Sequence, residues 1–109
     1  MHELAIAEQV VAIAEAGGRG ARVRRVVLRV GRLAAVMPDA LRFCFDAAAA
    51  DTMVEGARLE IVETPGRGRC RVCDIELELA DAWTSCACGA LDLEWLAGTE
   101  LEVEELEVE

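Results

Sequence analysis

Four of the chain's five cysteines form two close pairs. Cys70 and Cys73 are separated by two residues, Cys86 and Cys88 are separated by one, and a twelve-residue spacer lies between the pairs. A short turn places both sulfurs of such a pair on one side of a metal ion, and four thiolates suit tetrahedral Zn(II). The spacing therefore predicts a structural zinc site, with Ser85 where the outer cysteine of a regular second pair would fall.

Two other interpretations of the cysteine pairs remain open. Disulfides would need an oxidising compartment, and residues 1–8 lack the basic region and apolar core of a secretion signal. A redox-active pair would be expected to open a helix, whereas Cys73 is followed by alternating residues 74–79, a pattern typical of a strand. The fifth cysteine, Cys44, is expected to be a small apolar side chain in a core.

The amino terminus offers a second set of metal ligands. His2 is the chain's only histidine, and a bulky residue at position 2 normally prevents removal of the initiator methionine, so Met1 is expected to remain. The terminal amine, the His2 backbone nitrogen and the His2 imidazole can then close adjoining chelate rings, and Glu3 can add its backbone nitrogen or carboxylate. Nitrogen donors in a plane suit Ni(II) or Cu(II). From residue type alone, an ordinary exposed histidine remains the alternative.

Composition limits the classes of function. The formal charge is -10, and residues 51–109 carry sixteen acidic residues against four arginines, so nucleic-acid binding is not expected. No apolar run is long enough to span a membrane, and we expect a soluble, cytoplasmic protein. No nucleophile and base constellation or phosphate-binding glycine loop is visible, so a hydrolase or transferase is the least expected class.

Apolar periodicity predicts the elements that position these residues. An amphipathic helix is expected to start almost at residue 1 and to stop at Gly17–Gly18, followed by a strand over 22–30. Pro38 suits the first position of a second helix, and residues 58–63 read as a strand that ends at Pro65–Gly66.

The cysteine-containing region is expected to hold two more strands. Residues 74–79 and 91–95 alternate apolar and acidic positions, and Trp83 and Trp95 are expected to cover a small core. The positive charge of Arg67, Arg69 and Arg71 either offsets a four-thiolate centre or belongs to a solvated loop.

The last segment, residues 100–109, changes parity near Glu104–Glu105, which predicts one strand with a bulge or a bend between two sheets. We expect this strand to return to the first domain. The predicted fold is α+β: two helices on a small mixed sheet, residues 1–64 and 99–109, with an inserted zinc-ribbon-like domain, residues 65–98.

Together these motifs resemble the HypA/HybF family of hydrogenase nickel-incorporation proteins. The match lies in residues 1–4 with 6–7, the helix start at 38–45, residues 55–61, the two cysteine pairs and the closing residues 107–109. Two departures are visible: the second cysteine pair is tighter than the family's Cys-x-x-Cys, and Asp74 replaces the glycine usual after the first pair.

The resemblance implies a nickel metallochaperone without enzymatic activity. It implies Ni(II) at Met1, His2 and Glu3, and structural Zn(II) at the cysteines. The implied partners are a nickel-regulated GTPase and the large subunit of NiFe hydrogenase, with urease maturation proteins served by some members. The implied oligomeric state is a monomer or weak homodimer. The competing hypotheses are a zinc-ribbon protein-interaction module without nickel function and a thiolate-iron electron carrier.

Overall fold

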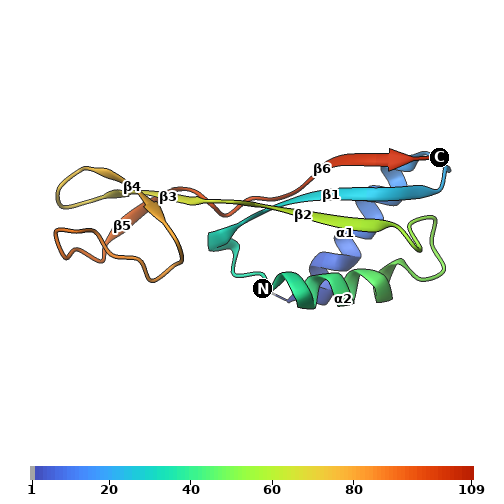
Figure 1. Cartoon of the computed structure of the whole chain (residues 1–109), viewed down its shortest axis with the longest axis horizontal. Helices are drawn as coiled ribbons and strands as arrows, with labels where there is room; N and C mark the ends of the chain where they lie inside the picture. Colours follow the sequence, from blue (N-terminus) through green and yellow to red (C-terminus); the bar gives the residue numbers. More distant parts are fainter. Residues whose placement is uncertain (1) are drawn as a thin grey trace. The chain divides into compact units, whose positions relative to one another are not determined.

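The computed structural model describes residues 2–109 and confirms the predicted α+β class. The described chain forms two three-stranded sheets, with strand orders β2-β1-β6 and β4-β3-β5. Within residues 2–109, no helix is long and apolar enough to cross a membrane. The elements in chain order are α1 (Glu3–Gly18), β1 (Val23–Gly31), the 3-10 helix η1 (Arg32–Ala34), α2 (Pro38–Ala49), β2 (Arg58–Thr64), β3 (Gly66–Cys70), β4 (Glu76–Leu79), β5 (Leu93–Ala97) and β6 (Leu101–Val108) (Figure 1).

The chain divides into two compact units. The first unit comprises Met1–Arg29, Val36–Val62 and Glu102–Glu109, and the second comprises Val30–Ala35 and Glu63–Leu101. The predicted domain limits, residues 1–64 with 99–109 and residues 65–98, stay a prediction.

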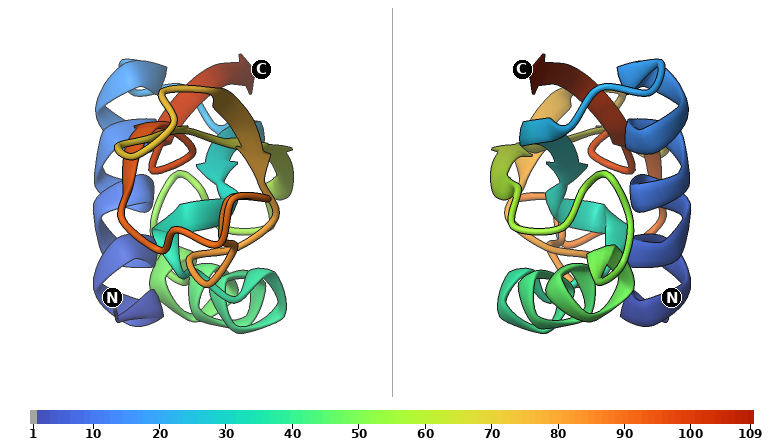
Figure 2. Two further views of the ribbon diagram at one scale, coloured as in Figure 1. Left: turned by 90° about the vertical axis from the view of Figure 1, so that its left-hand side faces the viewer. Right: turned by 90° about the vertical axis from the view of Figure 1, so that its right-hand side faces the viewer.

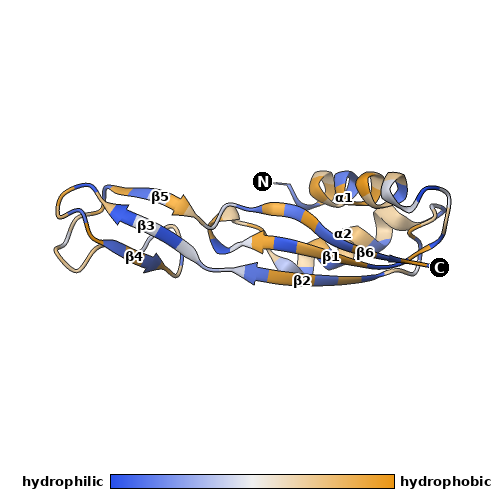
Figure 3. Cartoon of the chain, turned by 90° about the horizontal axis from the view of Figure 1, so that it is seen from above, coloured by the Kyte–Doolittle hydropathy of each residue, from blue (hydrophilic) through white to orange (hydrophobic). Residues whose placement is uncertain are grey.

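The sheet that contains β1 is mixed, as predicted. Strands β1 and β2 run in the same direction, whereas β6 runs in the opposite direction beside β1 (Figure 3). The backbone N–H of Glu109 donates to the carbonyl of Arg22 at 3.0 Å, which ties the end of the chain to the start of β1. The last strand therefore returns to the first sheet, as the sequence predicted.

Both helices contribute apolar faces to the core of the first unit. Helices α1 and α2 pack against each other, and Figure 2 shows that their axes are far from parallel. Burial of these faces supplies most of the stability of such short helices. The buried residues are Ile6, Ala7, Val10, Val11 and Ala14 of α1, Leu41, Phe45 and Ala49 of α2, and Val23, Val26, Val27, Leu28, Val54, Ala57 and Leu59 of the strands and loops.

The end of α1 differs in detail from the prediction. The helix does end at Gly18, but the left-handed residue that terminates it is Arg19, with φ 53° and an N–H bond to the Ala16 carbonyl. Gly17 lies within the last turn of the helix, where a Cβ atom would stand 2.6 Å from Leu106 of β6. Gly17 therefore serves close packing between the helix and the sheet.

Strand β6 changes the face it presents midway along its length. Glu104 pairs with Arg29 at 2.7 Å, and Glu105 pairs with Arg25 at 2.6 Å. Arg25 and Arg29 are four residues apart and share one face of β1, so two consecutive glutamates point to that face, as at a β-bulge. Because β6 belongs to one sheet, the alternative of a bend between two sheets is wrong.

The second unit is built on β3, a strand that the sequence did not predict. Strand β3 pairs antiparallel with β4 and with β5, which makes it the centre of the sheet. Gly66 and Gly68 gave this segment low strand propensity, but a Cβ atom at either would crowd Leu79. The glycines are thus needed for close packing across the sheet.

The expectation that Trp83 and Trp95 cover the core of the cysteine module is wrong. Trp83 is 86% exposed and Trp95 is 46% exposed. Between residues 65 and 98, the buried apolar side chains are Cys70, Leu79 and Cys86. A core this small leaves the cysteines as the main source of cross-links between its loops.

Candidate metal centre

The first cysteine pair sits on a tight turn at the end of β3. The backbone N–H of Cys70 donates to the carbonyl of Ile75, and the N–H of Asp74 donates to the carbonyl of Cys70, both at 2.9 Å. Asp74 has φ 62°, in the left-handed region that aspartate enters more readily than most residues. The turn after the first pair therefore contains an aspartate in a conformation that favours glycine.

The second pair also sits on a hydrogen-bonded turn. Cys86 donates its N–H to the carbonyl of Ala90 at 3.0 Å, and Gly89 donates to the carbonyl of Cys86 at 2.8 Å. Gly89 has φ 93°, which a residue with a side chain rarely adopts. The shorter spacing between Cys86 and Cys88 still places both sulfurs toward the first turn.

The structure brings the four predicted cysteine sulfurs together. All four Sγ atoms lie within 4.8 Å of one another; Cys70 and Cys88 are 3.7 Å apart, and Cys73 and Cys86 are 3.5 Å apart. Zinc–sulfur bonds of about 2.3 Å in a tetrahedron imply sulfur separations of roughly 3.8 Å, so the donor set fits the ion. All the cysteines are free thiols, and Cys44 lies half-buried on α2, outside this quartet.

Backbone hydrogen bonds prepare one sulfur of the quartet for metal binding. The N–H groups of Cys73 and Val72 each lie 3.4 Å from the Cys70 sulfur and lower its pKa to about 6. The pKa of Cys73 is raised to about 12: the Ile75 N–H lowers it, but the Cys86 sulfur and the other neighbouring sulfurs outweigh that effect. A thiolate is thus present at Cys70 near neutral pH, in the form that metal ions bind.

The arginines around the first pair are engaged with carboxylates. Arg69 lies 3.6 Å from Glu76, and Arg71 binds Asp92 at 3.1 Å. The backbone N–H of Arg71 also donates to the Asp92 carbonyl, which joins the first cysteine turn to the segment that follows the second. These arginines cross-link the module, and their exposed ion pairs leave little charge to offset the thiolates.

Two of the predicted nickel ligands, His2 and Glu3, lie at the start of α1. Met1 lies outside the described residues. His2 is exposed and is the N-cap of the helix; its carbonyl accepts the N–H of Ile6 at 3.2 Å, and its side chain makes no capping bond. Glu3 is half-buried, and its Oε2 accepts the N–H of Met37 at 3.3 Å. The Glu3 carboxylate therefore already has a partner within the protein.

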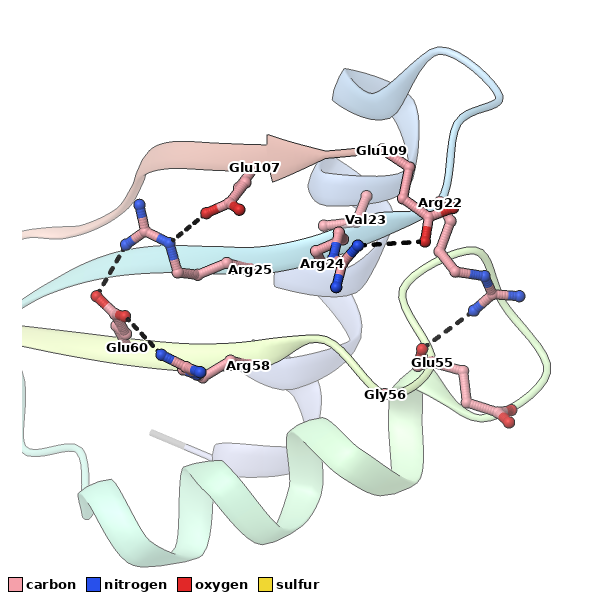
Figure 4. Close-up of a pocket in the computed structure, with 10 residues that line it drawn as sticks. All are labelled: Arg22, Val23, Arg24, Arg25, Glu55, Gly56, Arg58, Glu60, Glu107 and Glu109. Atoms are coloured by element: carbon pink, nitrogen blue, oxygen red, sulfur yellow. Dashed lines mark hydrogen bonds and ion pairs between the residues drawn. The ribbon is translucent and has the colours of Figure 1, made fainter.

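The first unit also has a surface hollow of about 730 Å³. Charged residues that form ion pairs with one another line it (Figure 4). Arg25 binds Glu60 at 2.9 Å and Glu107 at 3.0 Å, and the Glu107 hydrogen bond raises the pKa of Arg25 above its ordinary value. Of the predicted metal ligands that the structure describes, none lines the hollow. Its lining residues are Arg22, Val23, Arg24, Arg25, Glu55, Gly56, Arg58, Glu60, Glu107 and Glu109.

Comparison with known proteins supports the resemblance found in the sequence. Residues 1–108 match the family described as "HypA: Hydrogenase/urease nickel incorporation, metallochaperone, hypA". Hydrogenase maturation factor HypA of Nostoc punctiforme is 48% identical over 109 residues, which cover 100% of this chain and 96% of that protein. Hydrogenase maturation factor HypA of Geobacter metallireducens is 47% identical over 110 residues, which cover 100% of this chain and 100% of that protein.

A solved structure shares the fold. The solution structure of the Ni metallochaperone HypA from Helicobacter pylori matches with a TM-score of 0.70 and covers 99% of this chain and 97% of that chain. At 22% sequence identity, this likeness shows the fold alone.

Proposed function

Because this chain belongs to the HypA family of hydrogenase and urease nickel-incorporation proteins, we propose that it is a nickel metallochaperone for the large subunit of a NiFe hydrogenase. The match over residues 1–108 is the single observation that carries this proposal. In this role the protein binds, holds and surrenders Ni(II), and it has no enzymatic activity of its own.

We place nickel at the amino terminus, with Met1, His2 and Glu3. The backbone N–H groups of the first residues of an α-helix have no intrahelical acceptor. Because α1 begins at Glu3, the backbone nitrogens of His2 and Glu3 belong to this set. The exposed His2 imidazole and the terminal amine add two further nitrogen donors, and nitrogen donors in a plane suit Ni(II).

An exposed site at a chain end suits a carrier. Metal transfer requires that an incoming ligand reach the ion before all the outgoing ligands have left. His2 is exposed, and it is followed by a helix that holds its backbone in place. The site can therefore exchange ligands with a partner protein while the rest of the first unit stays folded.

We assign structural Zn(II) to Cys70, Cys73, Cys86 and Cys88. The sulfur separations fit the ion, and zinc would link two turns that few apolar contacts hold together. In this position zinc supplies folding free energy to the second unit. Buried Cys70 and Cys86 anchor the inner side of the quartet, whereas Cys73 and Cys88 are exposed.

The partners follow from the same proposal. We infer a nickel-regulated GTPase and the hydrogenase large subunit as partners in the cytoplasm, with urease maturation proteins as further recipients of nickel. The protein acts as a monomer or weak homodimer.

A calorimetric Ni(II) titration tests this function. Untagged, zinc-loaded wild-type protein is compared with the variant His2→Ala. Zinc content is measured before and after each titration. We expect one nickel per chain in the wild type, loss of that binding in the variant, and unchanged zinc in both. Equal nickel binding by the two proteins, or displacement of zinc by nickel, would favour a zinc-ribbon protein-interaction module without nickel function.

A further inference from the structure

The side chain of Glu3 joins the starts of the two helices of the first unit. Glu3 is the first residue of α1, and its Oε2 accepts a hydrogen bond from the backbone N–H of Met37, the N-cap of α2. The two residues are 34 positions apart in the chain. Glu3 is half-buried, and the two helices pack against each other.

The first turn of α2 lacks a cap of its own. The Met37 side chain makes no capping hydrogen bond, and Pro38 at the next position has no N–H group. In a capping box, a glutamate of the same helix accepts the N–H of the N-cap residue. Here a glutamate of the other helix accepts it, and its negative charge also lies at the positive end of the α2 dipole.

We propose that the Glu3 carboxylate is a cap for α2 and is not a nickel ligand. The nickel part of this inference rests on the proposed function. The Met37 N–H holds the carboxylate at the start of α2 through Oε2, and movement of the carboxylate away from α2 to nickel at the chain end would break that bond. Glu3 then binds nickel through its backbone nitrogen only. Its side chain holds the start of α1, which follows His2, against the start of α2.

Amide hydrogen exchange at Met37 tests the cap without any nickel. The zinc-loaded wild type is compared with Glu3→Ala, which lacks an acceptor, and with Glu3→Gln, which keeps an amide oxygen as acceptor. Exchange at Met37 is expected to be about tenfold faster in Glu3→Ala and close to wild type in Glu3→Gln. Glu8→Gln, on an exposed residue of the same helix, is the matched charge control and is expected to change nothing.

Nickel titration of the same variants tests the ligand assignment. We expect Glu3→Gln to keep nickel affinity within about threefold of wild type and to keep the visible absorption bands of bound nickel unchanged. Shifted bands in Glu3→Gln, or an unchanged Met37 exchange rate in Glu3→Ala, would overturn the proposal. If His2→Ala also left nickel binding unchanged, the proposed function would fail, and the exchange rates would still decide whether Glu3 caps α2.

Discussion

The sulfur atoms of Cys73 and Cys86 lie 3.5 Å apart, although one belongs to the turn after β3 and the other to the loop before β5. Cys70 and Cys88 make the second such contact, at 3.7 Å. Each of these close contacts joins the two turns. Any one cysteine therefore helps hold the turns together, so its loss is expected to affect the whole module.

Replacement of Cys86 by serine is expected to remove zinc from the protein. Cys86 is buried in the quartet, and loss of a thiolate ligand should cost more than the roughly 10- to 100-fold in affinity that loss of an outer-shell partner costs. Elemental analysis after competition with a chelator measures this. Cys44→Ser, on α2, is the matched control and should keep one zinc per chain; equal zinc retention by the two variants would show that Cys86 is not a ligand.

One residue added before Met1 is expected to weaken nickel binding strongly. The addition converts the terminal amine into an amide, which removes a chelating donor from the proposed site. The same residue added after Glu109 is the control and should leave the affinity unchanged. Calorimetry on both proteins distinguishes them, and an amino-terminally extended protein with wild-type affinity would exclude the terminus as the nickel site.

Acidification is expected to release nickel before zinc. The terminal amine has an unperturbed pKa of roughly 8 and an imidazole of about 6.5, so protons compete for these nitrogens as the pH falls through that range. A thiol that coordinates zinc is held deprotonated by the ion, so the closed quartet of four thiolates is expected to keep its metal through that range. Metal content measured by dialysis at stepwise lower pH checks the order, which release of zinc ahead of nickel would contradict.

Gly98→Ala is expected to destabilise the second unit by about 3 kcal/mol. Gly98 has φ 117°, and a Cβ atom there would lie 2.6 Å from the Gly66 Cα, so backbone strain and overpacking add. Gly20→Ala is the matched control: φ is 88°, but the space is open, so only strain of about 1 kcal/mol is expected. Denaturant unfolding of the zinc-loaded proteins compares them, and equal losses would exclude the packing contribution.

Much of the fold was predictable because its signals are local. Both helices and the irregularity of the last strand at Glu104–Glu105 follow from apolar periodicity. The cysteine quartet was predictable because a metal constrains the spacing of its ligands. Strand β3 was missed because Gly66 and Gly68 have low strand propensity, while the structure needs them for close packing.

The remaining details depend on contacts between residues far apart in the chain. The placement of Trp83 in solvent could not be read from its size, since an apolar residue is buried only where the fold supplies a partner surface. The bond from Met37 to Glu3 spans 34 residues and has no sequence motif. It bears directly on the choice, open at the level of sequence, between the backbone nitrogen and the carboxylate of Glu3.

X-ray absorption at the nickel and zinc edges of one untagged sample, loaded with one equivalent of each metal, tests the two-site account most directly. We expect four sulfur atoms around zinc and only nitrogen or oxygen around nickel, because the thiolates of Cys70, Cys73, Cys86 and Cys88 are assigned to zinc and the amino-terminal donors to nickel. Sulfur in the first shell of nickel, or nitrogen in that of zinc, would contradict it.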